Sequence, residues 1–439
     1  TTGSNNVAIG FQALRESEAA DNNTAVGYLS LMTNTTGSEN VGLGMQSLKS
    51  NTEGQKNVAI GANALCANTT ACCNTAVGHV AMQQNETGAK NAAFGFCALR
   101  GNTTASGNVA IGACSMIANT TGACNTAIGF FSMPANITGS KNVAVGTDSL
   151  DSNSGGDDNV AIGFDSLQAN TTASDNTAIG SLSLNDNTTG TQNTAIGTEA
   201  MRYGTTGSFN VALGTFTLGA SDVNTGNHNI AIGRKSLFDN TSGHQNIGIG
   251  SSALESNQTS ESNVAVGYIA LCSNTTGSSN TAIGVCAGCA VTTGGNNTMI
   301  GRLAGTSTSP FTVTDTSTNH RVVIGNNDIS NAYIKVAFTV TSDLRDKTEI
   351  KDVPLGLDFV DKLKPVSFKF KKSREDDTPT GTKHYGFLAQ DILELEGSDN
   401  VIIDDEQPDH LKYKGEHLVP VLVNAIKELS ARVKELENE

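Results

Sequence analysis

Short apolar segments alternate with polar turns along the first three quarters of the chain. A five-residue pattern recurs eighteen times, from residues 6–10 to residues 297–301: Asn, any residue, a small residue (Met299 in the last copy), an apolar residue and Gly. This alternation predicts a short β-strand in every copy. The closing glycines are 17 residues apart, except that 19 residues separate Gly214 from Gly233.

A second signal follows each glycine at a fixed distance. A small residue and then Leu or Met come three and four residues later, as at Ala13 and Leu14; Gly288 and Gly305 replace the Leu in the last two copies. A turn rich in Asn, Thr and Gly closes the repeat, since these residues tolerate positive φ or bond their own backbone. A unit of this length is too short for two helices and suits one coil of a parallel β-solenoid.

The repeat offers two apolar layers, the Ile/Val position of the strand and the Leu/Met position after the glycine. One coil alone buries little, so we expect chains to associate through one of these faces. The Asn of each motif recurs in phase along the chain, which predicts a ladder of side-chain amides from coil to coil.

The repeat is similar to the head domain of trimeric bacterial autotransporter adhesins, although its period is longer. The resemblance covers about residues 1–305. It implies a left-handed parallel β-roll in which three chains associate. It also implies an alternative function, a bacterial adhesin head that binds a host surface.

Composition and charge narrow the function. The chain has 47 Gly, no Trp and only 16% charged residues, so thin layers of small side chains must form its core. A net charge of −15 argues against a nucleic-acid partner. No run of 18 apolar residues is present, so we expect no membrane insertion. The first four residues repeat residues 35–38, and we expect the chain to start within a repeat.

Charge density changes near residue 341. Residues 342–439 hold 37 of the 69 charged side chains and five of the seven prolines. We therefore predict a mainly β chain with three parts: a solenoid shaft over 1–305, a β-rich connector over 306–341 and a small α+β domain over 342–439. Segments 320–325 and 333–338 are expected to be strands.

The last segment predicts a helix with an apolar seam. Its apolar positions step alternately by three and four residues, which is typical of a coiled coil. β-branched residues at one seam position and Leu at the other favour a dimer by themselves, whereas the family resemblances imply a trimer. The predicted seam consists of Val419, Leu422, Ile426, Leu429, Val433 and Leu436.

Residues 341–347 read Thr-Ser-Asp-Leu-Arg-Asp-Lys, and related segments follow at 354–360, 363–370 and 385–391. In this order they closely resemble the intramolecular chaperone domain of endosialidase-type phage tail spikes, over about residues 340–439. The resemblance implies a self-cleaving dyad with Ser342 as nucleophile and Lys347 as base, and a cut between Thr341 and Ser342. Asp343 and Arg345 are candidate supporting residues.

The implied chemistry is that of a serine peptidase that acts once on its own chain. A serine hydroxyl needs a base to take its proton, and lysine serves only when desolvation favours the neutral amine. Attack of Ser342 on the preceding carbonyl would give an ester that water hydrolyses. Asp346 stands where the family often has an apolar residue, and we expect its carboxylate to favour protonated Lys347 and slow the reaction.

Cysteines and sequons each allow two interpretations. Two pairs occupy equivalent places on adjacent coils: Cys97 with Cys114, and Cys272 with Cys289. Each pair is close enough to form a disulfide, or its members fill a tight layer as small apolar residues. Asn-x-Ser/Thr sequences recur at the turns as possible glycosylation sites, but turn chemistry is the favoured explanation. They begin at Asn34, Asn68, Asn85, Asn102, Asn119, Asn136, Asn170, Asn187, Asn240 and Asn274.

Together these features favour a viral or phage fibre of the tail-spike type, located on the virion surface and extracellular. We expect a homotrimer that meets a host-surface receptor or glycan, with no cofactor and no metal site. An ice-binding solenoid is disfavoured because the turn threonines are irregular. A glycosidase is disfavoured because the repeat offers no paired carboxylates.

Overall fold

The computed structural model describes residues 2–219, 223–329, 332–333, 342–371, 376–397, 400–406 and 408–438. The chain forms two compact units. One comprises residues 1–306 and 312–324, and the other comprises residues 307–311 and 325–439. In the described part of the chain, no helix combines the length and the apolar character needed to span a membrane.

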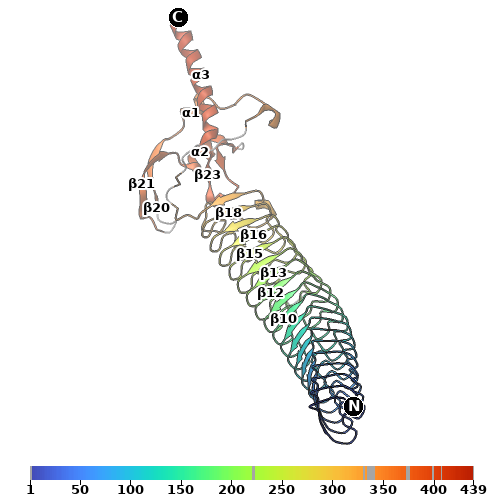
Figure 1. The fold of residues 1–439 in the computed structure, drawn as a ribbon. Coiled ribbons are helices and arrows are strands. Elements are labelled where there is room, and N and C mark those ends of the chain that lie inside the picture. Colours follow the sequence, from blue (N-terminus) through green and yellow to red (C-terminus); the bar gives the residue numbers. More distant parts are fainter. Residues whose placement is uncertain are drawn as a thin grey trace. The chain divides into compact units, whose positions relative to one another are not determined.

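Each repeat forms a three-residue strand that pairs in parallel with the strands of the neighbouring coils. Paired residues are one repeat apart in sequence, and Figure 1 shows the strands following one another along the shaft. β19 (Val322–Ile324), within the expected segment 320–325, extends the sheet beyond β18. These findings confirm the predicted parallel β-solenoid. The repeat strands are β1 (Val7–Ile9), β2 (Thr24–Val26), β3 (Val41–Leu43), β4 (Val58–Ile60), β5 (Thr75–Val77), β6 (Ala92–Phe94), β7 (Val109–Ile111), β8 (Thr126–Ile128), β9 (Val143–Val145), β10 (Val160–Ile162), β11 (Thr177–Ile179), β12 (Thr194–Ile196), β13 (Val211–Leu213), β14 (Ile230–Ile232), β15 (Ile247–Ile249), β16 (Val264–Val266), β17 (Thr281–Ile283) and β18 (Thr298–Ile300).

Small and aliphatic side chains fill the inside of each coil. The middle strand residue is usually Ala and is fully buried, as at Ala110 and Ala127. The Leu/Met column is also fully buried, as at Leu99 and Met116. Both of these residues have φ near the left-handed region, at 52° and 51°, which is unfavourable for residues with a Cβ. Burial of the Leu or Met side chain in the first sixteen coils offsets that backbone cost.

The Ile/Val column lies on the outside of the shaft. Because alternate strand residues point to opposite faces, an inward Ala places the next apolar residue outward. Ile60 is 36% exposed and Leu43 is 43% exposed, and the residue after the glycine is exposed as well, as at Phe96. Only the Leu/Met layer of the two expected apolar layers is therefore internal. We name the third residue of each strand and the residue after each glycine the outer stripe.

A column of turn asparagines runs through the shaft. Asn119 is fully buried, and its Nδ2 donates to Asn102 Oδ1 and to the Gly122 carbonyl, both at 3.0 Å. Its own Oδ1 accepts from Asn136 Nδ2 at 2.8 Å. All ten sequon asparagines belong to this column and are fully buried, so their side chains serve turn structure in the folded shaft. The column consists of Asn34, Asn51, Asn68, Asn85, Asn102, Asn119, Asn136, Asn153, Asn170, Asn187, Asn240, Asn257 and Asn274.

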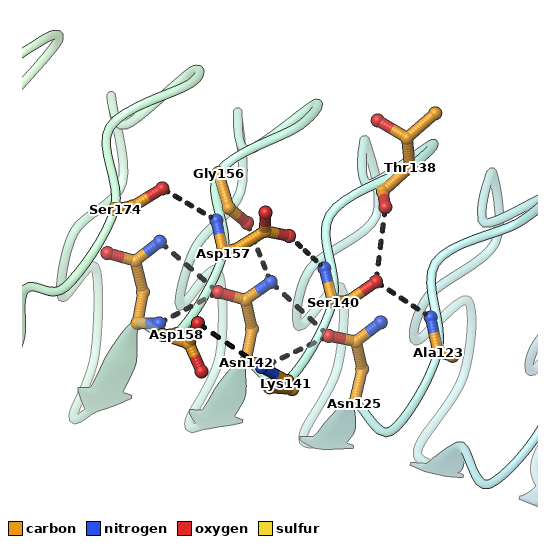
Figure 2. Close-up of polar contacts among 11 residues, drawn as sticks. Ala123, Asn125, Thr138, Ser140, Lys141, Asn142, Gly156, Asp157, Asp158 and Ser174 are labelled. Carbon is orange, nitrogen blue, oxygen red and sulfur yellow. Dashed lines mark hydrogen bonds and ion pairs between the residues drawn. The ribbon is translucent and has the colours of Figure 1, made fainter.

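The motif asparagines form a second buried column, shown in Figure 2. The backbone N–H of Asn142 donates to Asn125 Oδ1 at 2.9 Å, and Asn142 Nδ2 donates to the Gly156 carbonyl at 2.8 Å. The direct amide-to-amide distance in this column is longer, 3.3 Å between Asn142 and Asn125. The predicted amide ladder thus exists in this column, but the amide-to-amide hydrogen bonds of the turn column are shorter.

In the last coils of the shaft, the usually large position is small and a usually small position is large. Gly288 and Gly305 leave the Leu/Met column empty in the last two coils, and Met299 replaces the inward Ala of β18. A Cβ at Gly288 or at Gly305 would lie 2.9 Å from Met299 Sδ. The fully buried Met299 side chain therefore occupies the space that both glycines vacate.

The described residues of the second unit form three helices and two small antiparallel sheets. A core of Phe359, Ile392, Ile402, Ile403, Leu418 and Val421 joins the helices to the β22 segment. Antiparallel pairing joins β20 to β21 and β22 to β23. The elements are α1 (Leu357–Val360), β20 (Val366–Lys371), β21 (Pro379–Gly386), α2 (Ala389–Glu396), β22 (Ile403–Asp404), β23 (Lys412–Tyr413) and α3 (Leu418–Glu437), with 3-10 turns η1 (Thr316–Thr318) in the first unit and η2 (Leu344–Asp346), η3 (Pro408–His410) and η4 (Gly415–His417) in the second.

Polar side chains of α3 hold the segment that leads into α1. Asn424 Nδ2 donates to the Leu355 carbonyl at 3.0 Å, and Glu428 Oε2 accepts from the Leu357 N–H at 2.8 Å. A Cβ at Gly356 would lie only 2.0 Å from Glu428 Oε1, so a larger residue would have to displace this carboxylate. These partners are about seventy residues apart in sequence, and the sequence pattern did not reveal them.

We predict that Met299→Ala destabilises the end of the shaft by about 2–5 kcal/mol, because it opens a cavity beside two glycines. Met299→Leu, which nearly conserves volume, should cost less than about 1.5 kcal/mol. Chemical unfolding of the shaft measures both. Equal stability of the Ala variant and the wild type would contradict this packing.

We predict that Asn119→Ala destabilises the shaft by about 1–3 kcal/mol, because the buried Oδ1 of Asn102 and the carbonyl of Gly122 lose a donor. Thr121→Ala, two residues away on the exposed side of the turn, is the control and should be near neutral. Hydrogen exchange of the flanking coils gives the comparison. Indistinguishable protection in the two variants would refute a structural role for the column.

Candidate functional site

A tight turn brings Ser342 and Lys347 together. Lys347 Nζ donates to Ser342 Oγ at 2.7 Å, the contact that a Ser–Lys dyad requires. Between them lies η2, a single 3-10 turn in which the Lys347 N–H donates to the Leu344 carbonyl at 3.2 Å. Five extended residues would separate the ends by about 17 Å, so this reversal of the chain makes the contact possible.

Asp343 and Arg345 form an ion pair within the same turn. Arg345 Nε donates to Asp343 Oδ1 at 3.0 Å, and Nη2 donates to Oδ2 at 2.6 Å. Asp343 Oδ1 also accepts the Arg345 backbone N–H at 2.8 Å and so caps η2. Hydrogen bonds from Arg345 hold the pKa of the Asp343 carboxyl below its usual range.

Both members of the dyad are exposed in the single chain. The geometry for proton transfer is therefore present, but water still surrounds the amine. Because desolvation favours the neutral form of lysine, general-base chemistry would require a surface that covers Lys347. Thr341, the residue before the expected cut, lies outside the described residues, as do 334–338 of the expected strand 333–338.

The structure gives Asp346 a different setting from the one expected. Its backbone N–H donates to the Asp343 carbonyl at 3.2 Å, and its side chain is exposed. Among the described residues, no ion pair joins Asp346 to Lys347, whose amine is directed to Ser342. The expected restraint of Lys347 by this carboxylate is not formed in this conformation.

The C-terminal helix has two apolar faces. One face, with Leu418, Val421 and Ala425, is buried in the core of the second unit. The predicted seam forms the other face, and its members are 37–71% exposed. The heptad analysis identified only the second face, because the buried face is short. The exposed members are Val419, Leu422, Ile426, Leu429, Val433 and Leu436.

The cysteines pair differently from either stacked arrangement. Cys286 and Cys289 form a disulfide within one coil, with Cα atoms 5.1 Å apart, while Cys97, Cys114 and Cys272 are free thiols. Side chains stacked on adjacent coils run parallel, whereas a turn lets residues three apart face each other. No group of three or more His, Cys, Asp or Glu side chains in the described part of the chain is placed to hold a metal ion.

A protein-family model described as chaperone of endosialidase matches residues 342–402, beginning at the serine of the dyad. No curated protein and no solved structure matches the chain. The chain therefore carries an endosialidase-type chaperone domain near its C-terminus, preceded by a β-solenoid shaft.

Proposed function

We propose that this chain is a fibre protein of the phage tail-spike type, whose C-terminal domain joins three chains and then cuts each before Ser342. The match of residues 342–402 to the endosialidase chaperone, together with the 2.7 Å contact between Lys347 and Ser342, carries this proposal. The finished fibre lies on the virion surface and contacts a host receptor or glycan.

The cleavage follows from the dyad. Neutral Lys347 takes the Ser342 hydroxyl proton as Oγ attacks the carbonyl carbon of Thr341. That proton passes to the Ser342 nitrogen as the peptide bond breaks, leaving an ester between Thr341 and the serine oxygen. Water then hydrolyses the ester, giving a carboxylate on Thr341 and restoring the hydroxyl of Ser342, whose amino group is already free. One water molecule is consumed, and the reaction occurs once in each chain.

Two exposed apolar surfaces support association with further copies of the chain. The first is the seam of α3, whose heptad spacing suits a coiled coil. The second is the outer stripe of the shaft, which repeats with every coil and so is matched in spacing by another copy. Its exposed apolar members include Ile9, Phe11, Tyr28, Leu43, Met45, Ile60, Phe94, Phe96, Ile111, Ile128, Phe130, Ile162, Phe164, Ile196, Ile249, Tyr268, Ile283, Val285 and Ile300.

We predict that purified wild-type protein yields two fragments, one ending at Thr341 and one beginning at Ser342. Ser342→Ala lacks the nucleophile and Lys347→Gln lacks the base, so each variant should stay at full length. Denatured intact mass measures the products, with Lys351→Gln as a control lysine in the following loop. Fragments of the same mass from Ser342→Ala would rule out the dyad.

We predict that Leu429→Glu prevents association, because it places a charge on the exposed seam of α3. The matched control is Lys427→Glu, on an exposed position of the same helix outside the seam. Light scattering should give three times the 45.3 kDa chain mass for uncleaved Ser342→Ala protein and its Lys427→Glu form, and one chain for the Leu429→Glu form. A three-chain mass for Leu429→Glu would show that the seam does not drive assembly.

A further inference from the structure

We propose that Asp343 is the positioning residue of the cleavage site: it caps the turn that holds Lys347 on Ser342. This inference rests on the proposed self-cleavage, in which the dyad has assigned roles but Asp343 has none. It concerns the residue that maintains the geometry of the dyad.

The case begins with the backbone of the turn. η2 is only three residues long, so it has few internal hydrogen bonds to hold it. The first N–H groups of such a turn lack backbone partners, and a side-chain oxygen just before the turn can accept one. Asp343 is in that place, with an extended backbone (φ −69°, ψ 138°), and its Oδ1 accepts the Arg345 N–H at 2.8 Å.

The ion pair fixes the orientation of the same carboxylate. Arg345 reaches both oxygens, Oδ1 through Nε and Oδ2 through Nη2, and this two-point contact favours one rotamer of Asp343. The cap, rather than the charge, is what shapes the turn, because both side chains of the pair face solvent, where ion pairs contribute little. Arg345 therefore orients the capping residue and does not itself act on the dyad.

The turn then determines where the lysine amine lies. Closure of the backbone between Leu344 and Lys347 directs the Lys347 side chain back toward Ser342. Among the described residues, no second hydrogen bond or ion pair holds this amine. A displacement of about 1 Å in such a contact can cost on the order of a hundredfold in rate.

The test is the rate of self-cleavage in pulse-labelled full-length chains across a pH series. Asp343→Ala removes cap and ion pair, and it should slow cleavage by at least about tenfold. Asp343→Asn keeps a capping oxygen and should therefore cleave at close to the wild-type rate. Arg345→Ala leaves the cap in place and should cleave at a rate similar to that of Asp343→Asn. Asp346→Asn is the control: it also replaces an Asp of this turn by Asn, and it should cleave at the wild-type rate.

The shape of the pH profile separates positioning from proton transfer. A positioning residue lowers the plateau without moving the pH of half-maximal rate, whereas a group that transfers a proton moves that pH. The proposal would be overturned if Asp343→Ala cleaved at the wild-type rate, or if Asp343→Asn were as slow as Asp343→Ala. A shift in the pH of half-maximal rate would overturn it as well.

A second measurement does not depend on cleavage. In the uncleavable Ser342→Ala chain, hydrogen exchange of the peptide containing Arg345 and Lys347 should be faster with Asp343→Ala than with Asp343→Asn. Equal exchange in the two would overturn the capping role. If the wild type stays intact while exchange differs as expected, the turn is as proposed and the self-cleavage proposal fails.

Discussion

Buried amides whose partners lie one coil away hold the shaft together. Except for Asn34 and Asn240, each turn asparagine donates to the side-chain oxygen of the asparagine one repeat before it, so a coil is satisfied only when the next coil stacks in register. Where the next coil carries Gly204 or Val291, the side-chain oxygens of Asn187 and Asn274 have no partner among the described residues. Because a buried polar group without a partner is costly, stacking is cooperative, and this lets a thin core of Ala, Leu and Met suffice.

The same regularity creates a problem of register. Displacing one chain by a whole repeat against another replaces nearly every contact with an equivalent one. A few features mark position along the shaft: the two extra residues between Gly214 and Gly233, the interruption at Gly204, and the exchange of Met299 with Gly288 and Gly305. They are local, and most coils remain interchangeable. A domain outside the repeat that joins chains first, as proposed for the C-terminal domain, would solve this problem.

Sequence analysis recovered what depends on short spacing. The repeat period, the strand in each coil and the C-terminal helix all follow from residues close in sequence. It could not decide which apolar layer is internal, because Ile and Leu are equally apolar and only the inward Ala settles the face. Turn asparagines resemble exposed ones until stacking buries them. The hydrogen bonds from Asn424 and Glu428 to the segment before α1 join residues far apart in sequence, which no local pattern encodes.

The cleavage site likewise has one requirement that depends on neighbouring residues and one that does not. Its geometry is local, since the six residues from Ser342 to Lys347 place the nucleophile and the base together. Its environment is not local, since desolvation of the lysine amine requires a surface that lies outside this turn. In the trimer proposed above, a neighbouring chain is the candidate for that surface, and cleavage would then follow assembly. Hydrolysis would separate the shaft from the chaperone domain, and the persistence of the fibre would then depend on its unfolding rate.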